Sequence, residues 1–202
     1  MLRPLSTAAA VILIGVGIGV AAVLIAGNEP DVGAPELAAG TALTTPQALA
    51  DFQLIDHTGA AFGRRDLEGH WSLLFAGFTH CPDACPATLA VLSRIQQRLE
   101  AEGRSVRIVF LSVDPERDTP AQLARYVGYF GEGILAATGE RAEIDALADS
   151  MGLAYVRVPG SEGHYSFDHS TAVVLVDPAA RMAGYFRPPL DPDGLERDLR
   201  QL

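Results

Sequence analysis

Residues 71–86 of the chain read WSLLFAGFTHCPDACP, an apolar run followed by two cysteines with three residues between them. The first half of this stretch is continuously apolar, which is typical of a strand buried on both faces of a sheet. Residues 87–102 then carry leucine and isoleucine at steps of three and four, which predicts an amphipathic helix. Cys81 and Cys85 therefore lie between a central strand and a long helix.

The segments around this junction predict an α/β fold. Strand–helix–strand–helix followed by a hairpin and a helix is the order of a thioredoxin-like fold, for which we expect a central mixed sheet flanked by helices. The predicted elements, in chain order, are a hairpin over 52–62, the strand 71–78, the helix 87–102, a strand over 106–113, helices over 119–130 and 141–151, strands over 171–176 and 183–186, and a closing helix over 190–202.

The N-terminal segment predicts a single transmembrane helix that anchors the chain. Residues 7–26 are uncharged and almost entirely apolar, and about 20 such residues cross the roughly 30 Å hydrocarbon layer of a bilayer. Arg3 precedes this helix and acidic residues follow it, so residues 1–6 stay in the cytoplasm and the rest is sent outward. In a bacterium the chain would be a single-pass protein of the inner membrane, with its C-terminal domain in the periplasm. A cleaved signal peptide is the alternative.

The remainder divides into a linker and one domain. Residues 27–47 are rich in Gly, Pro, Ala and Thr and predict a flexible linker, whereas residues 48–202 have the length of one ordinary domain. The formal net charge is −10 and the chain has no lysine. Nucleic acid is not expected as a partner, because binding to phosphates needs clustered cations.

The two cysteines form one local site, since the chain has no others with which to build a disulfide framework. If a helix opens near Pro82 or Asp83, Cys81 and Cys85 lie one turn apart on the same face. The free N–H groups and the positive dipole end of that helix favour thiolate over thiol. Thiolate is both a nucleophile and a soft metal ligand. The pair is therefore suited to binding a metal, to forming a disulfide, or to both.

His169 is the best candidate for a third ligand. It comes just before the apolar strand 171–176, and in a thioredoxin-like sheet the loop that enters this strand passes beside the cysteine turn. Two thiolates and one imidazole suit copper or zinc, with thiolates favouring Cu(I) and imidazole accommodating Cu(II). A capping or surface histidine is the alternative. The other histidines lie in turns or beside Cys81 and are weaker candidates: His57, His70, His80 and His164.

Two carboxylates are candidates for orienting the imidazole or adjusting the charge of the site. Asp83 lies between the cysteines and Asp168 directly precedes His169. Groups of this kind commonly hold metal-bound histidines in place. A helix cap or a solvated loop carboxylate explains either residue equally well.

Four stretches occur in the order found in the Sco/SenC family of copper-site assembly proteins: GFTHCPDACP (77–86), SVDPERDTP (112–120), DHS (168–170) and VDP (176–178). The chain resembles that family over about residues 48–202. The resemblance implies copper, Cu(I) or Cu(II), held by two cysteines and one histidine. It implies a membrane-anchored metallochaperone that assembles the dinuclear copper site of cytochrome c oxidase. The implied partners are the copper-site subunit of the oxidase and other copper carriers.

The residues leave a second activity open. A thiol–disulfide oxidoreductase that reduces the cysteines of the oxidase copper site would use Cys81 and Cys85 as its redox pair. Such an enzyme needs no histidine, so His169 discriminates between the two functions. A peroxidase is disfavoured, because Phe78 occupies the place of the threonine expected three residues before the attacking cysteine. A zinc-structured binding module is a further alternative.

Overall fold

The computed structural model describes residues 35–161 and 164–202. The predicted cytoplasmic end (1–6) and membrane anchor (7–26) lie outside the described residues, as does the linker as far as residue 34. Across the two described ranges, no helix is both long enough and apolar enough to cross a membrane. The anchor stays a prediction from the sequence.

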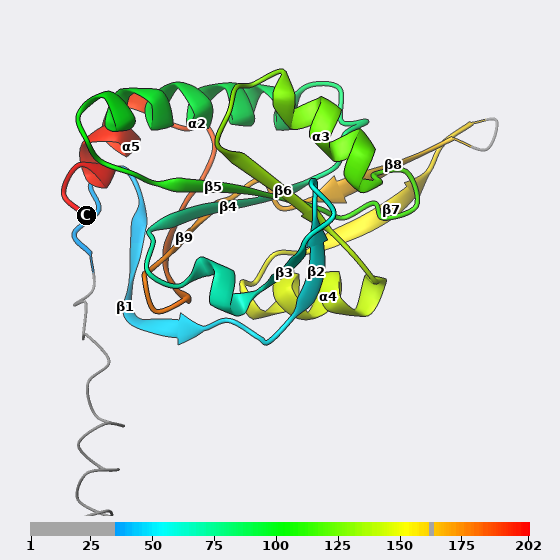
Figure 1. Ribbon diagram of the computed structural model, residues 1–202, viewed down its shortest axis with the longest axis horizontal. Coiled ribbons are helices and arrows are strands. Elements are labelled where there is room, and N and C mark those ends of the chain that lie inside the picture. Colours follow the sequence, from blue (N-terminus) through cyan, green and yellow to red (C-terminus); the bar gives the residue numbers. More distant parts are fainter. Residues whose placement is uncertain (1–34, 162–163) are drawn as a thin grey trace, which may run out of the picture. The chain divides into compact units, whose positions relative to one another are not determined.

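A mixed sheet of eight strands forms the centre of the domain, in the order β1-β10-β9-β4-β5-β6-β2-β3 (Figure 1). Its strands are β1 (Thr41–Ala48), β2 (Gln53–Asp56), β3 (Ala61–Gly63), β4 (Ser72–Gly77), β5 (Arg107–Ser112), β6 (Ile134–Thr138), β9 (Val173–Val176) and β10 (Arg181–Phe186). The neighbours β4, β5 and β6 run parallel, whereas β9 pairs antiparallel with β4 on its other side. The predicted central mixed sheet is confirmed.

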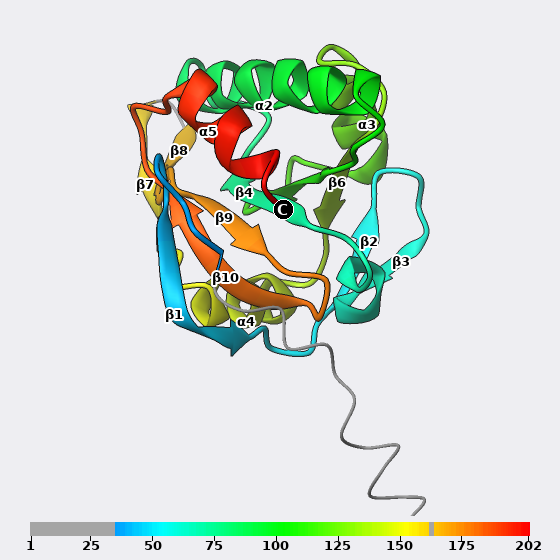
Figure 2. The same cartoon turned by 90° about the vertical axis from the view of Figure 1, so that its left-hand side faces the viewer.

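Helices cover both faces of this sheet (Figures 1 and 2). They are α2 (Ala84–Ala101), α3 (Pro120–Gly128) and α5 (Pro192–Leu199) on one face, and α4 (Arg141–Ser150) with the 3-10 helix η1 (Arg64–Leu67) on the other. Side chains of β4 alternate between the two layers: Leu73 and Phe75 pack with α2, whereas Leu74 and Ala76 pack with α4. Because β4 is buried on both faces, its sequence is continuously apolar, as predicted.

The folded domain begins earlier than the predicted boundary at residue 48. Strand β1 takes up the last part of the predicted linker 27–47 and pairs with β10 at the edge of the sheet. Ahead of it, the backbone N–H groups of Ala38 and Ala39 donate to the Asp198 carboxylate at 2.9 and 2.8 Å. The sequence did not predict this strand, because it contains Pro46 and pairs with β10 in an irregular register. An edge strand tolerates such a proline, whereas a central strand would exclude it.

Strand β6 was also not predicted from the sequence. It connects α3 to α4 and adds a third parallel strand beside β5. Its sequence ILAAT is short and rich in alanine, a residue depleted in strands. Pairing with β5 and β2 on its two sides, and burial, override this weak local preference.

A second, two-stranded sheet projects from the domain (Figure 1). Its strands are β7 (Tyr155–Pro159) and β8 (Tyr165–His169), which form an antiparallel hairpin. His169 is the last residue of β8, whereas the sequence placed it in a loop. The hairpin makes no ladder with the main sheet among the described residues, so the histidine is carried by a separate element.

Candidate metal centre

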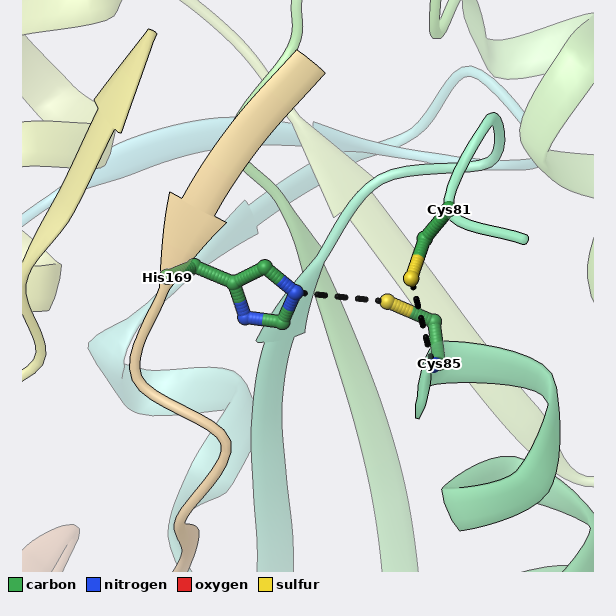
Figure 3. Close-up of side chains that lie close together, drawn as sticks. All are labelled: Cys81, Cys85 and His169. Carbon is green, nitrogen blue, oxygen red and sulfur yellow. Dashed lines mark hydrogen bonds between the residues drawn. The ribbon is translucent and has the colours of Figure 1, made fainter. Parts of the chain in front are cut away.

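The pairing of β4 with β9 brings the distant histidine to the cysteines. Phe75 of β4 lies opposite Val173 of β9, so the chain entering β9 arrives where β4 ends and the cysteine loop begins. His169 comes four residues before Val173 and points back over this loop (Figure 3). The antiparallel register thus joins two segments that lie more than 80 residues apart, as the 84-residue separation of Cys85 and His169 shows.

The three side chains converge on one point. One ligand atom of each residue, the two sulfurs and a ring nitrogen, lies within 4.8 Å of the others. The Sγ atom of Cys85 is 3.5 Å from Nε2 of His169, and the backbone N–H of Cys85 donates to Sγ of Cys81 at 3.4 Å (Figure 3). Both cysteines are free thiols. Cys81 lies in the loop before α2 and is half-buried, whereas Cys85 lies in the first turn of α2 and is fully buried.

The imidazole is oriented by a backbone carbonyl and two aromatic rings. Nδ1 of His169 lies 3.0 Å from the carbonyl oxygen of Ser170. Because a carbonyl only accepts, Nδ1 carries the hydrogen, and the lone pair of Nε2 faces the sulfurs. Phe75 and Phe78 contact the ring edge-on, with centroids 6.0 and 5.9 Å from that of the imidazole. The nitrogen that a metal needs is therefore free and aimed at the site.

The two predicted orienting carboxylates are not part of this arrangement. Asp83 is the N-cap residue of α2, but its exposed side chain makes no capping hydrogen bond. Asp168 is exposed and, as the neighbour of His169 on β8, points to the opposite side of the hairpin. The Ser170 carbonyl does what a carboxylate was expected to do. A sequence pattern could not indicate it, since every residue carries a carbonyl.

Burial decides the protonation of Cys85. The expectation that the helix N-terminus favours thiolate is wrong for this residue, because burial, and then the neighbouring Cys81 and Asp118, raise the pKa of its thiol. The one helical N–H that contacts a sulfur here is directed at Cys81 instead. Without a metal, Cys85 is therefore a neutral thiol at pH 7, and a metal must displace its proton to bind.

A glycine allows Cys85 to pack against the end of β4. A Cβ atom placed on Gly77 would lie 2.7 Å from Sγ of Cys85 and 2.8 Å from Cε2 of Phe110. Neither the sulfur nor the ring has room to withdraw, because both side chains are fully buried. The absence of a side chain at position 77 is thus a condition for this sulfur position.

The buried carboxylate of Asp118 holds the cysteine loop through hydrogen bonds. Asp118 accepts hydrogen bonds from the Thr79 backbone N–H at 2.9 Å, the Thr79 hydroxyl at 2.6 Å and the Ser112 hydroxyl at 2.6 Å. His80, Asp114 and Asp118 also lie close enough to share an ion, but these donors already occupy Asp118, and Arg117 and Tyr165 occupy Asp114. The helix predicted over 119–130 begins beside this carboxylate as α3, and the Thr119 hydroxyl caps it by accepting from the Gln122 N–H at 3.3 Å.

Two sulfurs and one imidazole nitrogen form a donor set of soft to intermediate character. Such a set suits copper or zinc and is poorly matched to magnesium or calcium, which take oxygen ligands. Three protein ligands also leave a coordination position open to a further group. The arrangement can hold a thiophilic metal, and the two free thiols can also exchange electrons by forming a disulfide.

Comparison with known proteins agrees with this geometry. The SCO1/SenC family model matches residues 41–202, which begin with β1. The SCO2 homolog of Bos taurus mitochondria is 41% identical over 139 residues, which are 67% of this chain and 52% of the relative. The chain thus spans about half the length of that mitochondrial relative.

Solved structures share the fold. ScoI of Bradyrhizobium japonicum, solved with copper bound, is 35% identical with a TM-score of 0.71, covering 77% of this chain and 99% of that one. BsSco, described as having a disulfide switch and as a member of the Sco family of cytochrome c oxidase assembly proteins, is 25% identical with a TM-score of 0.63, covering 77% and 93%. With its motifs, its thioredoxin-like fold and a family match over residues 41–202, the chain belongs to the SCO1/SenC family.

Proposed function

We propose that this chain is a membrane-anchored copper metallochaperone that holds one copper ion with Cys81, Cys85 and His169. It delivers this ion to the dinuclear copper site of cytochrome c oxidase. The observation that carries the proposal is the convergence of two sulfurs and an imidazole nitrogen within 4.8 Å, with Nε2 facing the Cys85 sulfur. Copper is the first-row ion for which such a site has the highest intrinsic affinity.

The burial of the three ligands suits transfer. Cys85 is fully buried and fixed in α2, whereas Cys81 and His169 are half-buried and reach the surface. An incoming ligand from a partner enters the open coordination position and displaces the accessible groups first. Cys85 is then the last protein ligand to release the copper ion.

The oxidase role and the location rest on the sequence and on relatives. BsSco, one of the similar structures, belongs to a family described as cytochrome c oxidase assembly proteins. The predicted anchor 7–26 and the positive-inside rule favour a domain on the outer side of the bacterial inner membrane. There it can meet the copper-site subunit of the oxidase and receive copper from other carriers.

The test is copper binding by the purified, reduced full-length chain in mild detergent. We expect close to one copper per chain and, for Cu(II), an intense thiolate-to-copper charge-transfer band in visible light. His169→Ala should weaken Cu(II) binding more than Cu(I) binding, because Cu(I) tolerates coordination by two sulfurs alone. His70→Ala, which changes an exposed histidine outside the centre, is the matched control. Absence of the band, or equal behaviour of the two variants, would overturn the ligand assignment.

A thiol–disulfide oxidoreductase is the second candidate function, favoured by the two free thiols that lie side by side. It would reduce the cysteines of the oxidase copper site and would not need His169. Deletion of the gene, followed by rescue of oxidase activity, separates the two functions. Rescue by added copper supports delivery, whereas rescue by a thiol reductant alone supports reduction.

A further inference from the structure

The hairpin that carries His169 depends on contacts outside its own ladder. Strands β7 and β8 pair only with each other among the described residues, and an isolated two-stranded hairpin is marginally stable in water. Whatever fixes this hairpin therefore also fixes the distance between the imidazole and the sulfurs. At the end of β8 far from His169, contacts around Tyr165 do this.

Tyr165 lies between two guanidinium groups. The guanidinium carbons of Arg117 and Arg157 lie 3.7 and 3.6 Å from the centroid of its ring, a stacked cation–π geometry. Arg117 also donates to the backbone carbonyl of Tyr165 at 3.1 Å. The Tyr165 hydroxyl donates to Asp114 at 2.9 Å. The first strand position of β8 is thus tied to the segment that follows β5.

The two arginines differ in how firmly they are held. Arg117 is 23% exposed and pairs with the fully buried Asp114, whereas Arg157 is 48% exposed and pairs with Glu116, itself 55% exposed. Exposed ion pairs contribute little, because solvent screens them. A buried pair holds its geometry, because breaking it leaves an uncompensated charge. Arg117 is therefore the rigid side of the clamp, and Arg157 is the loose side.

A row of aromatic contacts leads from this clamp to the imidazole. Along β8, every second residue lies on the same face of the hairpin, and this face carries Tyr165, Phe167 and His169. The Phe167 ring lies 5.8 Å from Tyr165 and 5.5 Å from Phe78, and Phe78 lies 5.9 Å from His169. Phe78 directly precedes the cysteine loop. A shift of Tyr165 therefore moves the face that packs the imidazole against the cysteine half of the centre.

We propose that Arg117 is a positioning residue of the metal centre, which sets the place of the His169 imidazole by clamping Tyr165 of the hairpin. This inference rests on the proposed function. Loss of the clamp lets the hairpin move away from the sulfurs. Cu(II), which requires the imidazole, is then held less tightly, whereas Cu(I) stays bound by the two sulfurs.

Arg117→Lys is the first test variant, because it keeps the charge beside Asp114 but loses the planar group that stacks on Tyr165 and donates to its carbonyl. We expect the Cu(II) dissociation constant of the full-length chain to rise about 10-fold, the lower end of the effect of outer-shell partners. The Cu(I) constant should change less than about 2-fold, and the charge-transfer band should shift. Arg157→Lys, the same change on the exposed side of the ring, should leave all three unchanged.

A second variant and a metal-free measurement keep the test decisive. Tyr165→Leu removes the clamped ring and leaves the Arg117–Asp114 pair intact, and it should reproduce the selective loss of Cu(II) affinity. In the copper-free chain, amide hydrogen exchange at Ser166 and Asp168, whose N–H groups point toward β7, should accelerate in both variants while exchange in β4 stays unchanged.

Equal losses of Cu(I) and Cu(II) affinity, or unchanged exchange in β8, would overturn the positioning role. Failure of the wild-type chain to bind copper, with faster β8 exchange in the variants, would instead overturn the proposed function and leave the clamp standing.

Discussion

The two halves of the metal centre are built in different ways. Cys81 and Cys85 lie where β4 meets α2, over a buried carboxylate and against the core. His169 ends a hairpin that has no ladder with the main sheet in the described part of the chain. It contacts the cysteine half through an edge-on ring contact with Phe78 and a 3.5 Å approach of Nε2 to the Cys85 sulfur. We call Cys81 and Cys85 the core half of the centre, because they are packed into the core of the domain. We call His169 the docked half, because a separate hairpin carries it to the cysteines.

This difference assigns separate tasks to the two halves. A pair of sulfurs is sufficient for Cu(I), which accepts low coordination numbers, whereas Cu(II) also needs the imidazole. The core half should therefore set whether copper binds at all. The docked half should set which oxidation state is preferred and how readily it is released.

The largest effect is expected from Cys85→Ser, which removes the buried ligand of the core half. Both Cu(I) and Cu(II) affinities should fall by more than the roughly 100-fold that outer-shell substitutions reach, because serine is a poor ligand for soft copper. Competition with a chromophoric chelator measures both constants. Cys81→Ser, at the half-buried ligand, is the comparison. Retention of Cu(I) binding by Cys85→Ser would mean that the core half is not the primary site.

Gly77→Ala tests the packing of the core half without replacing a ligand. The added Cβ meets the Cys85 sulfur at 2.7 Å, so we expect unfolding in urea to become easier by about 2 kcal/mol, as overpacked cores usually do. Gly128→Ala is the matched control. Nothing lies within 4 Å of a Cβ there, and alanine in a helix should stabilise by about 0.5 kcal/mol. Equal effects of the two variants would contradict the close-packing argument.

The same contrast explains which parts the sequence predicted. The core half follows from local patterns: the apolar run of β4, the amphipathic α2 and the cysteine spacing gave the correct elements. The position of the docked half depends instead on the pairing of strands that are far apart in the sequence, β9 with β4. His169 was placed correctly beside the cysteines only because the fold was recognised, and the hairpin that carries it was missed.

Other misses have the same physical origin. The Ser170 carbonyl orients the imidazole, and because it is a backbone group, the identity of the residue does not indicate this role. Asp118 binds Thr79, a residue 39 positions away, so its motif could be quoted but its role could not be derived. Strand β1 depends on its partner β10 rather than on its own composition.

A smaller effect is expected from pH, and between pH 9 and 10 its largest single part comes from Cys85 in the core half. Burial raises the pKa of Cys85 above its ordinary 9.0, so above pH 9 the unfolded chain loses this proton while the folded, reduced, metal-free chain keeps it. The unfolded state then binds fewer protons, and stability falls as pH rises. Between pH 9 and 10 the loss should be about 1 kcal/mol, measured by urea unfolding under reductant.

The matched variant is Cys85→Ala, which should abolish this part of the pH slope. The range stops at pH 10 because burial also raises the pKa values of Tyr126, Tyr155 and Tyr165, whose ordinary value is 10.0. These groups add slopes of the same sign at higher pH. An unchanged slope in Cys85→Ala would assign the titration to another group. Stability that rises with pH would contradict the raised pKa.

The smallest effect is expected from Asp168→Asn, which sharpens the description of the docked half. The exposed carboxylate lies on the side of β8 opposite to the imidazole, and at physiological ionic strength charges are screened over about 8 Å. We expect Cu(I) and Cu(II) affinities to change less than about 2-fold, within the range of exposed charges. Asp83→Asn, at the exposed N-cap of α2, gives the equivalent measurement on the core half. If Asp168→Asn alone cost tenfold in Cu(II) affinity, the carboxylate would have to share the orienting role with the Ser170 carbonyl, and the hairpin would have to rotate when copper binds.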